Sequence, residues 1–418
     1  MDSSSTALFT AALGLTAPWS VISLEFDTNR QQLDLSLGFP AGSTFDCPVC
    51  EHSGCKVHDT VERTWRHLDF FQHRCLLHAR QPRVKCPEHG IKTVTPPWAR
   101  PGSGFTLLME AYLMLLVENG MTPLQVGRIT REHDTRIWRV LQHYVDTARK
   151  KADYSAVHAI GVDETSRCRG QNYITIFMDL HQKSPRVLFA TEGKDSATIK
   201  AFKADLEAHK GAAGQIDEVC LDMSKAFIKG VREEFPDAAM TFDSFHLMQL
   251  MNKAVDTVRR EEQKTHPELK GTRYVWLKND WNRTEKQTET FNELRASSLK
   301  TARATHLKTV FQDIFAETDP AEAEQLLKRW YFWATHSRIE PMIKAAKSIK
   351  EHWEGVLRWF HSRLTNALLE ATNGLIQSAK RRSRGFRSTR YLITMVYMVA
   401  GKLDLKLPPL RIAFAHTK

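Results

Sequence analysis

Two short cysteine–histidine motifs have the spacing of a metal site. Cys47 and Cys50 are separated by two residues, as are Cys86 and His89, and 35 residues lie between the two pairs. Such turns present soft or borderline ligands in the number that tetrahedral zinc prefers. A closed set of four protein ligands leaves no position for water, so the sequence predicts a structural rather than a catalytic zinc ion.

Two further pairs with the same spacing lie in this region. Cys55 with His58 and Cys75 with His78 could hold a second zinc ion, or they could be ordinary residues of a basic, histidine-rich fold. Five of the seven cysteines fall between residues 47 and 86. An odd number of clustered cysteines is poor for a secreted disulfide framework and better for metal binding in a reducing cytoplasm.

Three carboxylates have positions that suit hard metal ions. Asp163 and Asp222 each end a short apolar run that indicates a buried strand, and Glu370 lies among apolar residues of a later helix. A carboxylate in such a place is costly unless a cation meets it. Oxygen ligands of this kind hold paired Mg²⁺ ions during phosphoryl transfer. Taken alone, each of these three acids is more typical of a structural or capping role. Glu164 follows Asp163 and should point to the opposite face if the strand continues, so it is taken as a non-ligand.

The charge of the chain indicates a polyanionic partner. Its 418 residues include 59 Lys and Arg against 48 Asp and Glu, a net charge of +11. This excess favours a nucleic acid, and more weakly an anionic membrane surface. Residues 63–100 hold eight basic and two acidic residues, and residues 375–411 hold nine and one. No segment provides the run of about 20 apolar residues that a membrane span needs, and the N-terminus lacks the basic region of a signal peptide.

Residues 121–145 carry two short helical patterns separated by a turn, which is typical of a helix-turn-helix. Thr122 followed by Pro123 suits the start of the first helix. Arg136 and Arg139 fall at the beginning of the second, where residues that read a DNA groove lie. A helical hairpin in any bundle would show the same pattern, and the adjoining basic zinc region favours the DNA-binding interpretation. The apolar seam is predicted to comprise Leu124, Val126, Ile129, Ile137, Val140 and Leu141.

The elements that must position these residues follow from the hydrophobic pattern. A hairpin and a linker precede the helical segment, and a three-strand meander, a helix, a strand, a helix and a strand follow it. The rest is almost all helix, with tryptophans as core anchors. The predicted ranges are hairpin 21–26 and 33–37, linker 96–104, helices 105–149, strands 157–162, 173–180 and 186–190, helix 196–209, strand 218–222, helix 227–235, strand 240–242, helices 246–360 and helix 361–383. The anchors are Trp276, Trp281, Trp330, Trp333, Trp353 and Trp359.

The order of these strands and helices resembles a ribonuclease H-like fold, in which acids lie on the first strand, the fourth strand and a late helix. A series of motifs then points to one family. In order along the chain these are CPVC, RTWRHLDFFQH, CPEHG, PPWARPGSGFT, GVDETS, CLDMSKAF, FDSFH and LEATNGLIQSAKRRSRGFRS. Over nearly its whole length the sequence is similar to bacterial insertion-sequence transposases of the DDE class, in the ISL-three group.

The resemblance implies a catalytic site and a fold class. Asp163, Asp222 and Glu370 would be the catalytic ligands of two Mg²⁺ (or Mn²⁺) ions. The fold would be α/β plus all-α: a zinc module and a helix-turn-helix, then a ribonuclease H-like domain with a mixed sheet and a long α-helical insertion. The expected divisions are 1–46 (hairpin for dimerisation or packing), 47–95 (zinc-binding DNA recognition), 104–150 (helix-turn-helix), 155–246 (first part of the catalytic core), 247–360 (insertion) and 361–418 (completion of the core, with a basic C-terminal segment).

Three polar residues are candidates for catalytic support. Asp243 and His246 match a D-x-x-H element that follows the second acid in several such families. His246 would then aid DNA strand placement, although a purely structural histidine is an equal alternative. Asn373 lies three residues after Glu370 on the same helix face, where it would steady Glu370 or touch DNA.

Basic residues in three places are candidates for DNA contacts. They lie between the zinc motifs, in the second helix of the helix-turn-helix, and in residues 380–390, which hold six basic residues and no acidic one. Solvated charged faces are the plain alternative. The candidates are Arg63, Arg66, Arg136, Arg139, Lys380, Arg381, Arg382, Arg384 and Arg387.

The function that follows is a DNA transposase of an insertion sequence. It would bind terminal inverted repeats, hydrolyse a phosphodiester at each end and join the 3′-OH to target DNA. Its partners would be double-stranded DNA and further copies of itself, as a homodimer or larger synaptic assembly, in the bacterial cytoplasm at the nucleoid and with no membrane. The alternatives are a DNA-binding regulator, or a nuclease of the same fold without transposition; a zinc hydrolase fits least, because the cysteine-rich site is saturated.

Overall fold

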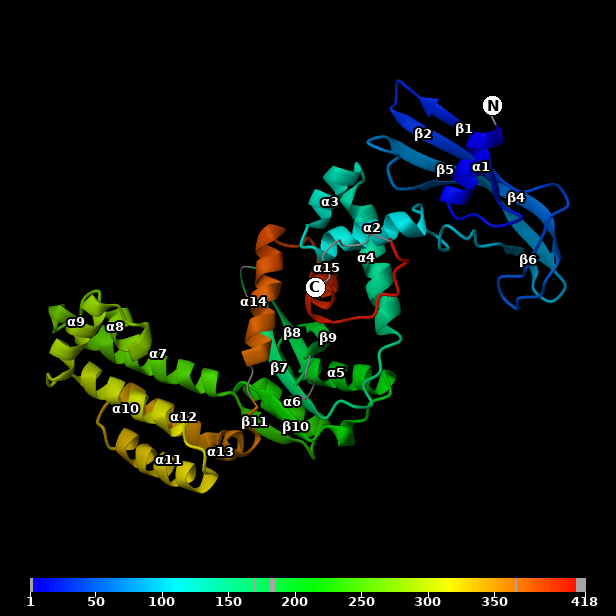
Figure 1. The fold of residues 1–418 in the computed structure, drawn as a ribbon. Helices are drawn as coiled ribbons and strands as arrows, with labels where there is room; N and C mark the ends of the chain where they lie inside the picture. Colours follow the sequence, from blue (N-terminus) through cyan, green and yellow to red (C-terminus); the bar gives the residue numbers. More distant parts are fainter. Residues whose placement is uncertain (1–2, 169, 171, 181–184, 365–366, 411–418) are drawn as a thin grey trace. The chain divides into compact units, whose positions relative to one another are not determined.

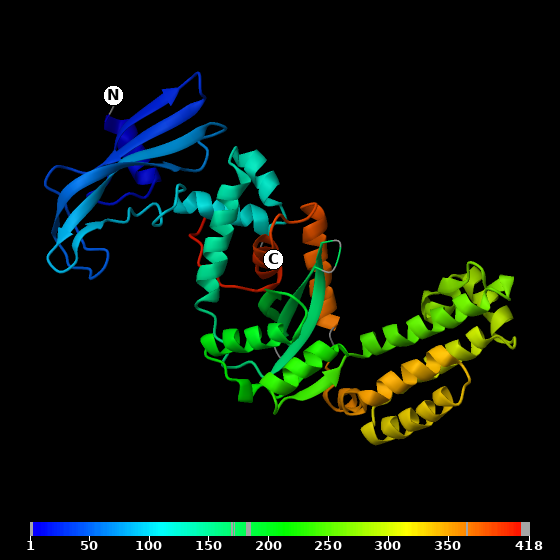
Figure 2. The ribbon, with the colours of Figure 1, turned by 180° about the vertical axis from the view of Figure 1, so that it is seen from behind.

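The computed structural model describes residues 3–168, 170, 172–180, 185–364 and 367–410. The chain divides into two compact units, residues 1–146 with 404–418 and residues 147–403. Figure 1 traces most of the first unit in blue to cyan and the second in green to orange-red, and Figure 2 shows the same ribbon from behind.

The first unit contains a six-stranded sheet in the order β1-β2-β5-β4-β3, with β6 pairing with β5. The predicted N-terminal hairpin is confirmed as β1 and β2, and Leu33, Leu35 and Leu37 of β2 are buried in alternation. Because β2 pairs in parallel with β5, the hairpin and the zinc region share one sheet. The elements are α1 (Ser3–Ala12), β1 (Ser20–Asp27), β2 (Gln32–Gly38), β3 (Thr44–Phe45), β4 (Cys55–Arg66), β5 (Arg74–Cys86) and β6 (Gly90–Thr93).

The segment that we predicted as a linker is packed against this sheet. Trp98 is 8% exposed, and its ring makes edge contacts with Trp19 and Trp65 at centroid distances of 4.8 and 5.6 Å. The predicted linker is confirmed as an irregular connection between residues 93 and 107, but the prolines around Trp98 shape a turn that buries the indole, so the segment is not a free connection.

Three helices follow, α2 (Leu107–Glu118), α3 (Pro123–Thr130) and α4 (Asp134–Arg149). The predicted break is confirmed: Thr122 caps α3 in a capping box with Gln125, and Pro123 occupies the first turn. Gly127 is required where α3 and α4 approach, since a Cβ there would lie 2.6 Å from the Glu132 carbonyl oxygen.

Only part of the predicted helix-turn-helix seam is buried. Val126, Ile137, Val140 and Leu141 are at most 1% exposed, but Leu124 and Ile129 are each 53% exposed. The prediction was wrong for these two residues, because α3 is only two turns long and buries the face of Pro123, Val126, Gly127 and Thr130.

The second unit begins with a five-stranded mixed sheet in the order β11-β10-β7-β8-β9. As predicted, β7, β8 and β9 form an antiparallel meander, and β10 and β11 lie parallel to β7. The turn expected around residues 181–184 lies outside the described residues. The elements are β7 (Ala159–Cys168), β8 (Asn172–Asp179), β9 (Arg186–Glu192), α5 (Ser196–Ala208), the 3-10 turn Ala213–Gln215, β10 (Glu218–Leu221), α6 (Lys225–Glu234) and β11 (Ala239–Phe242).

Strand β7 is longer than its apolar run predicts. It continues through Asp163 to Cys168 by pairing with β8, so Asp163 lies inside the strand rather than at its end. The polar second half of β7 faces α14, where Thr165 accepts a hydrogen bond from Gln377. The length of an apolar run therefore underestimates the length of a strand when the polar groups of its second half have hydrogen-bond partners elsewhere.

Seven helices lie in sequence between β11 and α14 and share a hydrophobic core with the sheet. Trp276 and Trp330 are fully buried and Trp359 is 8% exposed, but Trp281 and Trp333 are 75% and 50% exposed, so these two are not core anchors. The helices are α7 (Ser244–Glu262), α8 (Arg273–Leu277), α9 (Glu285–Arg295), α10 (Lys300–Ile314), α11 (Pro320–Thr335), α12 (Glu340–Glu351) and α13 (Trp353–Ser362), with 3-10 turns at Pro267–Leu269 and Asp280–Asn282.

Two helices complete the unit, α14 (Ala367–Arg382) and α15 (Thr389–Ala400). The predicted continuous helix 361–383 was wrong, since α13 ends at Ser362 and Arg363 adopts a left-handed conformation with φ 55°. Helix α15 packs on β9, where the Ala190 N–H donates to the Tyr397 hydroxyl at 3.1 Å. None of the helices in the described part of the chain is long and apolar enough to cross a membrane.

Candidate active site and metal centres

Three aspartates lie level with one another, Asp163 on β7 and the other two directly after the neighbouring strands β10 and β11. The parallel register that sets Cys220 of β10 opposite Gly161 of β7 brings Asp222 level with Asp163 when it continues by two residues. The register of β10 with β11 brings Asp243 level with Asp222 in the same way. Because adjacent strands are about 4.8 Å apart and level residues of parallel strands share a face, these carboxylates converge on one place.

Helix α14 is fastened along β7. Asn373 Nδ2 donates to Oδ2 of Asp163 at 2.7 Å. Further along the helix, Gln377 Nε2 and Lys380 Nζ both donate to the carbonyl oxygen of Ser166, at 3.1 and 2.7 Å. These bonds hold the first turn of α14, which carries the third predicted carboxylate, beside the strand.

The environment of Asp163 disfavours its negative charge. Burial raises the pKa of Asp163 to about 6, the backbone N–H of Glu164 and the ring of His246 oppose the shift, and the carboxylates of Asp222 and Glu164 add to it. Asp222 lies just beyond β10 and accepts a hydrogen bond from the Ser224 N–H at 3.0 Å. Negative charge therefore outweighs positive charge around Asp163, which is an imbalance that a bound cation would relieve.

Glu370 has the same imbalance. Burial raises its pKa, the Asp243 carboxylate adds to the shift and His246 opposes it. Among the described residues, the buried Oε1 of Glu370 and Oδ1 of Asn373 find no hydrogen-bond partner. Unpartnered hard oxygens beside crowded carboxylates fit a divalent cation such as Mg²⁺. In the described part of the chain, however, Asp163, Asp222 and Glu370 are not mutually within 4.8 Å as a set.

The two residues of the D-x-x-H element join this site. Asp243 is 1% exposed and precedes the first turn of α7, which carries His246. His246 acts electrostatically on both Asp163 and Glu370. A third element, α7, thus contributes a residue to the surroundings of these carboxylates, beside β7 and α14.

The first zinc set is assembled as a compact cluster. One potential ligand atom from each of Cys47, Cys50, Cys86 and His89 lies within 4.8 Å of all the others. Cys86 Sγ is 3.7 Å from both Cys50 Sγ and His89 Nδ1. Sulfurs at about 2.3 Å from a tetrahedral zinc ion lie about 3.8 Å apart, so these four residues fit that ion.

The second set is not brought together. Val57 pairs with Val84 at one end of the β4–β5 hairpin and Arg66 with Leu76 at the other, which separates Cys55 and His58 from Cys75 and His78. Cys55 Sγ instead contacts the His52 carbonyl oxygen at 3.4 Å, and His78 Nε2 lies 2.7 Å from Asp34. Of the two alternatives, ordinary residues of the fold fit this arrangement better than a shared second zinc ion, because the equally spaced pairs fall at opposite ends of the hairpin.

The predicted DNA contacts differ in their exposure. Arg66 is 2% exposed and forms ion pairs with Asp69 and Glu132, so it is a structural residue rather than a free DNA contact. Arg136 also pairs with Glu132, and it stacks over the ring of Phe105 at 4.0 Å. Lys380 belongs to α14 and is half-buried, with its Nζ bonded to the Ser166 carbonyl oxygen of β7. The exposed candidates are Arg63, Arg139, Arg381, Arg382, Arg384 and Arg387.

Two residues with evident roles escaped the sequence analysis. Gln377 fastens α14 to β7, and the available signal was its place four residues after Asn373 on the same helix face. Glu132 has a side chain that is 3% exposed, and it gathers Arg66, Arg74 and Arg136 at the turn before α4. No pattern in the sequence distinguishes this acid from a solvated one.

Comparison with known families covers most of the chain. A family profile described as "Transposase" matches residues 160–396. The profile of the "Helix-turn-helix domain of transposase family ISL3" matches residues 94–145. The profile of the "zinc-finger of transposase IS204/IS1001/IS1096/IS1165" matches residues 43–89.

Two curated relatives align along most of their length. The "Transposase for insertion sequence element IS1557" of Mycobacterium tuberculosis is 30% identical over 371 residues, covering 80% of this chain and 81% of the relative. The "Transposase for insertion sequence element IS1001" of Bordetella parapertussis is 26% identical over 366 residues, covering 83% and 87%.

Proposed function

Because this chain belongs to the ISL3 family of insertion-sequence transposases, we propose that it cuts DNA at the ends of its element with Asp163, Asp222 and Glu370 and joins the freed 3′-OH to target DNA. Family membership implies DNA cleavage and transfer in general terms. The choice of residues and the chemistry are the proposal.

One observation carries this assignment. Asp163 and Asp222 are level on adjacent parallel strands, and Asn373 ties the helix that carries Glu370 to the Asp163 carboxylate. Acids from two strands and a helix would thus serve one site, an arrangement that supports the proposal of a ribonuclease H-like catalytic fold. Helices α7 to α13 would then be an insertion into it, with the domain divisions expected from the sequence.

The three carboxylates would hold two Mg²⁺ (or Mn²⁺) ions. When bound, the ions would activate a water molecule or the 3′-OH of the DNA as nucleophile and would stabilise the leaving oxygen. The protein's own contribution is positional: Asn373 orients one carboxylate oxygen of Asp163, and burial keeps Asp163 and Glu370 poorly solvated until a cation meets them.

Asp243 and His246 would act beside the ligands. The electrostatic contact of His246 with Asp163 and Glu370 supports a role in setting their charge or in holding the scissile strand. Asp243 would fix the start of α7 and so the position of His246. Neither residue needs to bind metal for the reaction proposed.

End recognition would belong to the first unit. A structural zinc ion on Cys47, Cys50, Cys86 and His89 would fix the zinc module, and α4 would enter the major groove with Arg139 exposed. The exposed arginines near the end of α14 would contact phosphates that flank the cut. Two ends must be held together, so we expect a homodimer or larger synaptic assembly on the bacterial nucleoid.

The direct test uses DNA carrying the terminal inverted repeats of the element. Asp163→Ala, Asp222→Ala and Glu370→Ala should each abolish Mg²⁺-dependent strand cleavage and joining while end binding persists. Full cleavage by any of the three would overturn the assignment. Wild-type protein that binds ends but never nicks them would favour a DNA-binding regulator on the same fold.

A further inference from the structure

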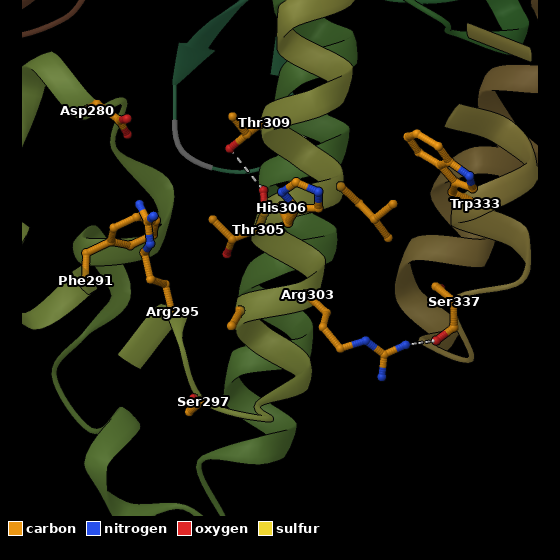
Figure 3. A pocket seen from close by; sticks show the side chains of 12 residues that line it. Asp280, Phe291, Arg295, Ser297, Arg303, Thr305, His306, Thr309, Trp333 and Ser337 are labelled. Atoms are coloured by element: carbon orange, nitrogen blue, oxygen red, sulfur yellow. Dashed lines mark hydrogen bonds between the residues drawn. The ribbon is translucent and has the colours of Figure 1, made fainter. Parts of the chain in front are cut away.

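A groove runs over α10, away from the proposed catalytic residues. It encloses about 580 Å³, and Figure 3 shows His306 on α10 between Phe291 and Arg295 on one side and Trp333 on the other. Arg303, one turn before His306, donates through Nη2 to the Ser337 carbonyl oxygen at 2.6 Å, which fixes its guanidinium at the edge of the groove.

The aromatic wall of this groove is not explained by the core. Trp333 is 50% exposed, although α11 buries Trp330 completely one turn earlier. A half-exposed indole beside a cavity leaves a ring face available to a ligand. An exposed aromatic ring that lines a cavity offers a large, rigid apolar face to a ligand, which distinguishes Trp333 from exposed aromatic residues elsewhere on the surface.

The charge of the groove is positive and uncompensated. In the described part of the chain, no carboxylate lies within 4.0 Å of Arg295, Arg303 or His306. The acid that lines the groove, Asp280, is already paired with Arg283 at 2.6 Å. Residues 291–310 hold four Lys and Arg and a single acidic residue. An anionic ligand would therefore meet Arg295 and Arg303 without displacing a carboxylate from them.

We propose that this groove binds single-stranded DNA, with a base on Trp333 and the flanking phosphates at Arg303 and Arg295. Sequence-tolerant binding of single strands combines an aromatic platform with a basic channel, which is the combination found on α10 and α11. Duplex DNA offers phosphates but buries the faces of its bases, so the Trp333 wall favours the unpaired strand. The inference rests on the DNA substrate of the proposed function but not on its metal ligands.

The test measures affinity with the full-length chain in buffer without added Mg²⁺. The probes are a fluorescent oligo(dT) of about 20 nucleotides and a duplex of the same length without the inverted repeat. Trp333→Ala should weaken oligo(dT) binding roughly 5- to 100-fold and leave duplex binding unchanged. Arg303→Ala should weaken it in the same direction, and Trp333→Phe should retain most of the affinity.

Phe332 provides the matched control, since it is 58% exposed on the same helix but does not line the groove. Phe332→Ala should bind oligo(dT) like wild type. Equal losses for Trp333→Ala and Phe332→Ala would overturn the proposal, as would unchanged oligo(dT) binding by Trp333→Ala. A shift from dimer to monomer in Trp333→Ala with intact oligo(dT) binding would identify the groove as an interface between copies instead, and would also overturn it.

A second readout locates the strand. Photocrosslinking of an oligonucleotide that carries 5-iododeoxyuridine should label Trp333, and labels confined to α3 and α4 would contradict the proposal. The outcome is separate from the catalytic assignment: variants of Asp163, Asp222 or Glu370 that lose cleavage should still crosslink, because these acids do not line the groove.

Discussion

The amide Nδ2 of Asn373 donates to Oδ2 of Asp163 at 2.7 Å and so joins α14 to the middle of β7. The bond crosses 210 residues of sequence and connects the helix of Glu370 to the strand of the first acid. Asn373 lies one turn after Glu370, so its bond to Asp163 sets the position of the Glu370 carboxylate along β7. Asn373 is thus a positioning residue of the proposed site.

Asn373→Ala should slow single-turnover cleavage of end DNA roughly ten- to hundredfold, since a hydrogen bond to a carboxylate contributes about 1.5–3 kcal/mol. End binding, measured by gel shift, should not change. The control is Leu375→Ala on the same helix, where the side chain is 56% exposed and makes no such contact. Equal rates for the two variants would refute a positioning role for Asn373.

The purified protein should contain one zinc ion per chain. Cys86→Ser should lose that zinc and with it duplex end binding, because the four ligands join β5 to the segment before β4. Cys75→Ala removes a buried cysteine of the set that is not assembled, and it should retain one zinc ion by elemental analysis. Two zinc ions in wild type, one of them lost in Cys75→Ala, would show that the second set assembles after all.

Arg139→Ala should weaken DNA binding, whereas Arg66→Ala should lower the stability of the first unit. Arg139 is exposed near the start of α4, so its loss should weaken end binding by about 1–3 kcal/mol with no change in melting temperature. Arg66 is buried against Glu132, so its loss should destabilise the first unit by roughly 2–4 kcal/mol. Thermal melts and anisotropy titrations separate the two. Arg66→Ala protein that melts like wild type but binds DNA weakly would contradict the structural role.

His67 should make the first unit sensitive to acid. Burial, with Arg66 adding to it, lowers the pKa of His67 to about 4, and its Nδ1 lies 2.9 Å from the Thr106 hydroxyl that caps α2. The unfolded chain binds a proton near pH 6.5 and the folded chain does not, so stability falls as the pH drops from about 6.5 towards 4. This group should contribute roughly 1.5 kcal/mol of loss between pH 6.5 and 5.

The measurement for His67 is the melting temperature across this range for wild type and His67→Asn. Asparagine keeps an acceptor for the Thr106 hydroxyl but does not titrate, so its curve should be flatter below pH 6.5. Parallel curves for the two proteins would show that the pKa of His67 is not lowered.

The sequence predicts the sheet of the second unit well, because most of its strands are short apolar runs between turns. It underestimates β7, where Thr165 and Ser166 are satisfied by Gln377 and Lys380 from a helix about 200 residues away. Local pattern carries no information about such partners. The families matched along the chain agree with the order of motifs.

Exposure is the property that the sequence predicts least well. Trp281 and Trp333 are large apolar residues, which predicts a place in the core, but they lie on the surface. Arg66 is a basic residue, which predicts a DNA contact, but it is buried. In each case the outcome depends on which face of an element meets a distant one. The carboxylates of the proposed site are predictable by type and order and stay a prediction, whereas Gln377 and Glu132 acquire their contacts only through the tertiary structure.

The central claim is that Asp222, with Asp163 and Glu370, binds the metal ions that cleave DNA. Asp222→Cys tests it most directly, since a thiolate is a poor ligand for Mg²⁺ but a better one for softer divalent ions such as Mn²⁺. Single-turnover cleavage of end DNA by this variant should be lost in Mg²⁺ and recovered in Mn²⁺, while Asp222→Ala stays inactive in both. Cleavage by Asp222→Cys and Asp222→Ala in Mg²⁺ at the wild-type rate would contradict the account.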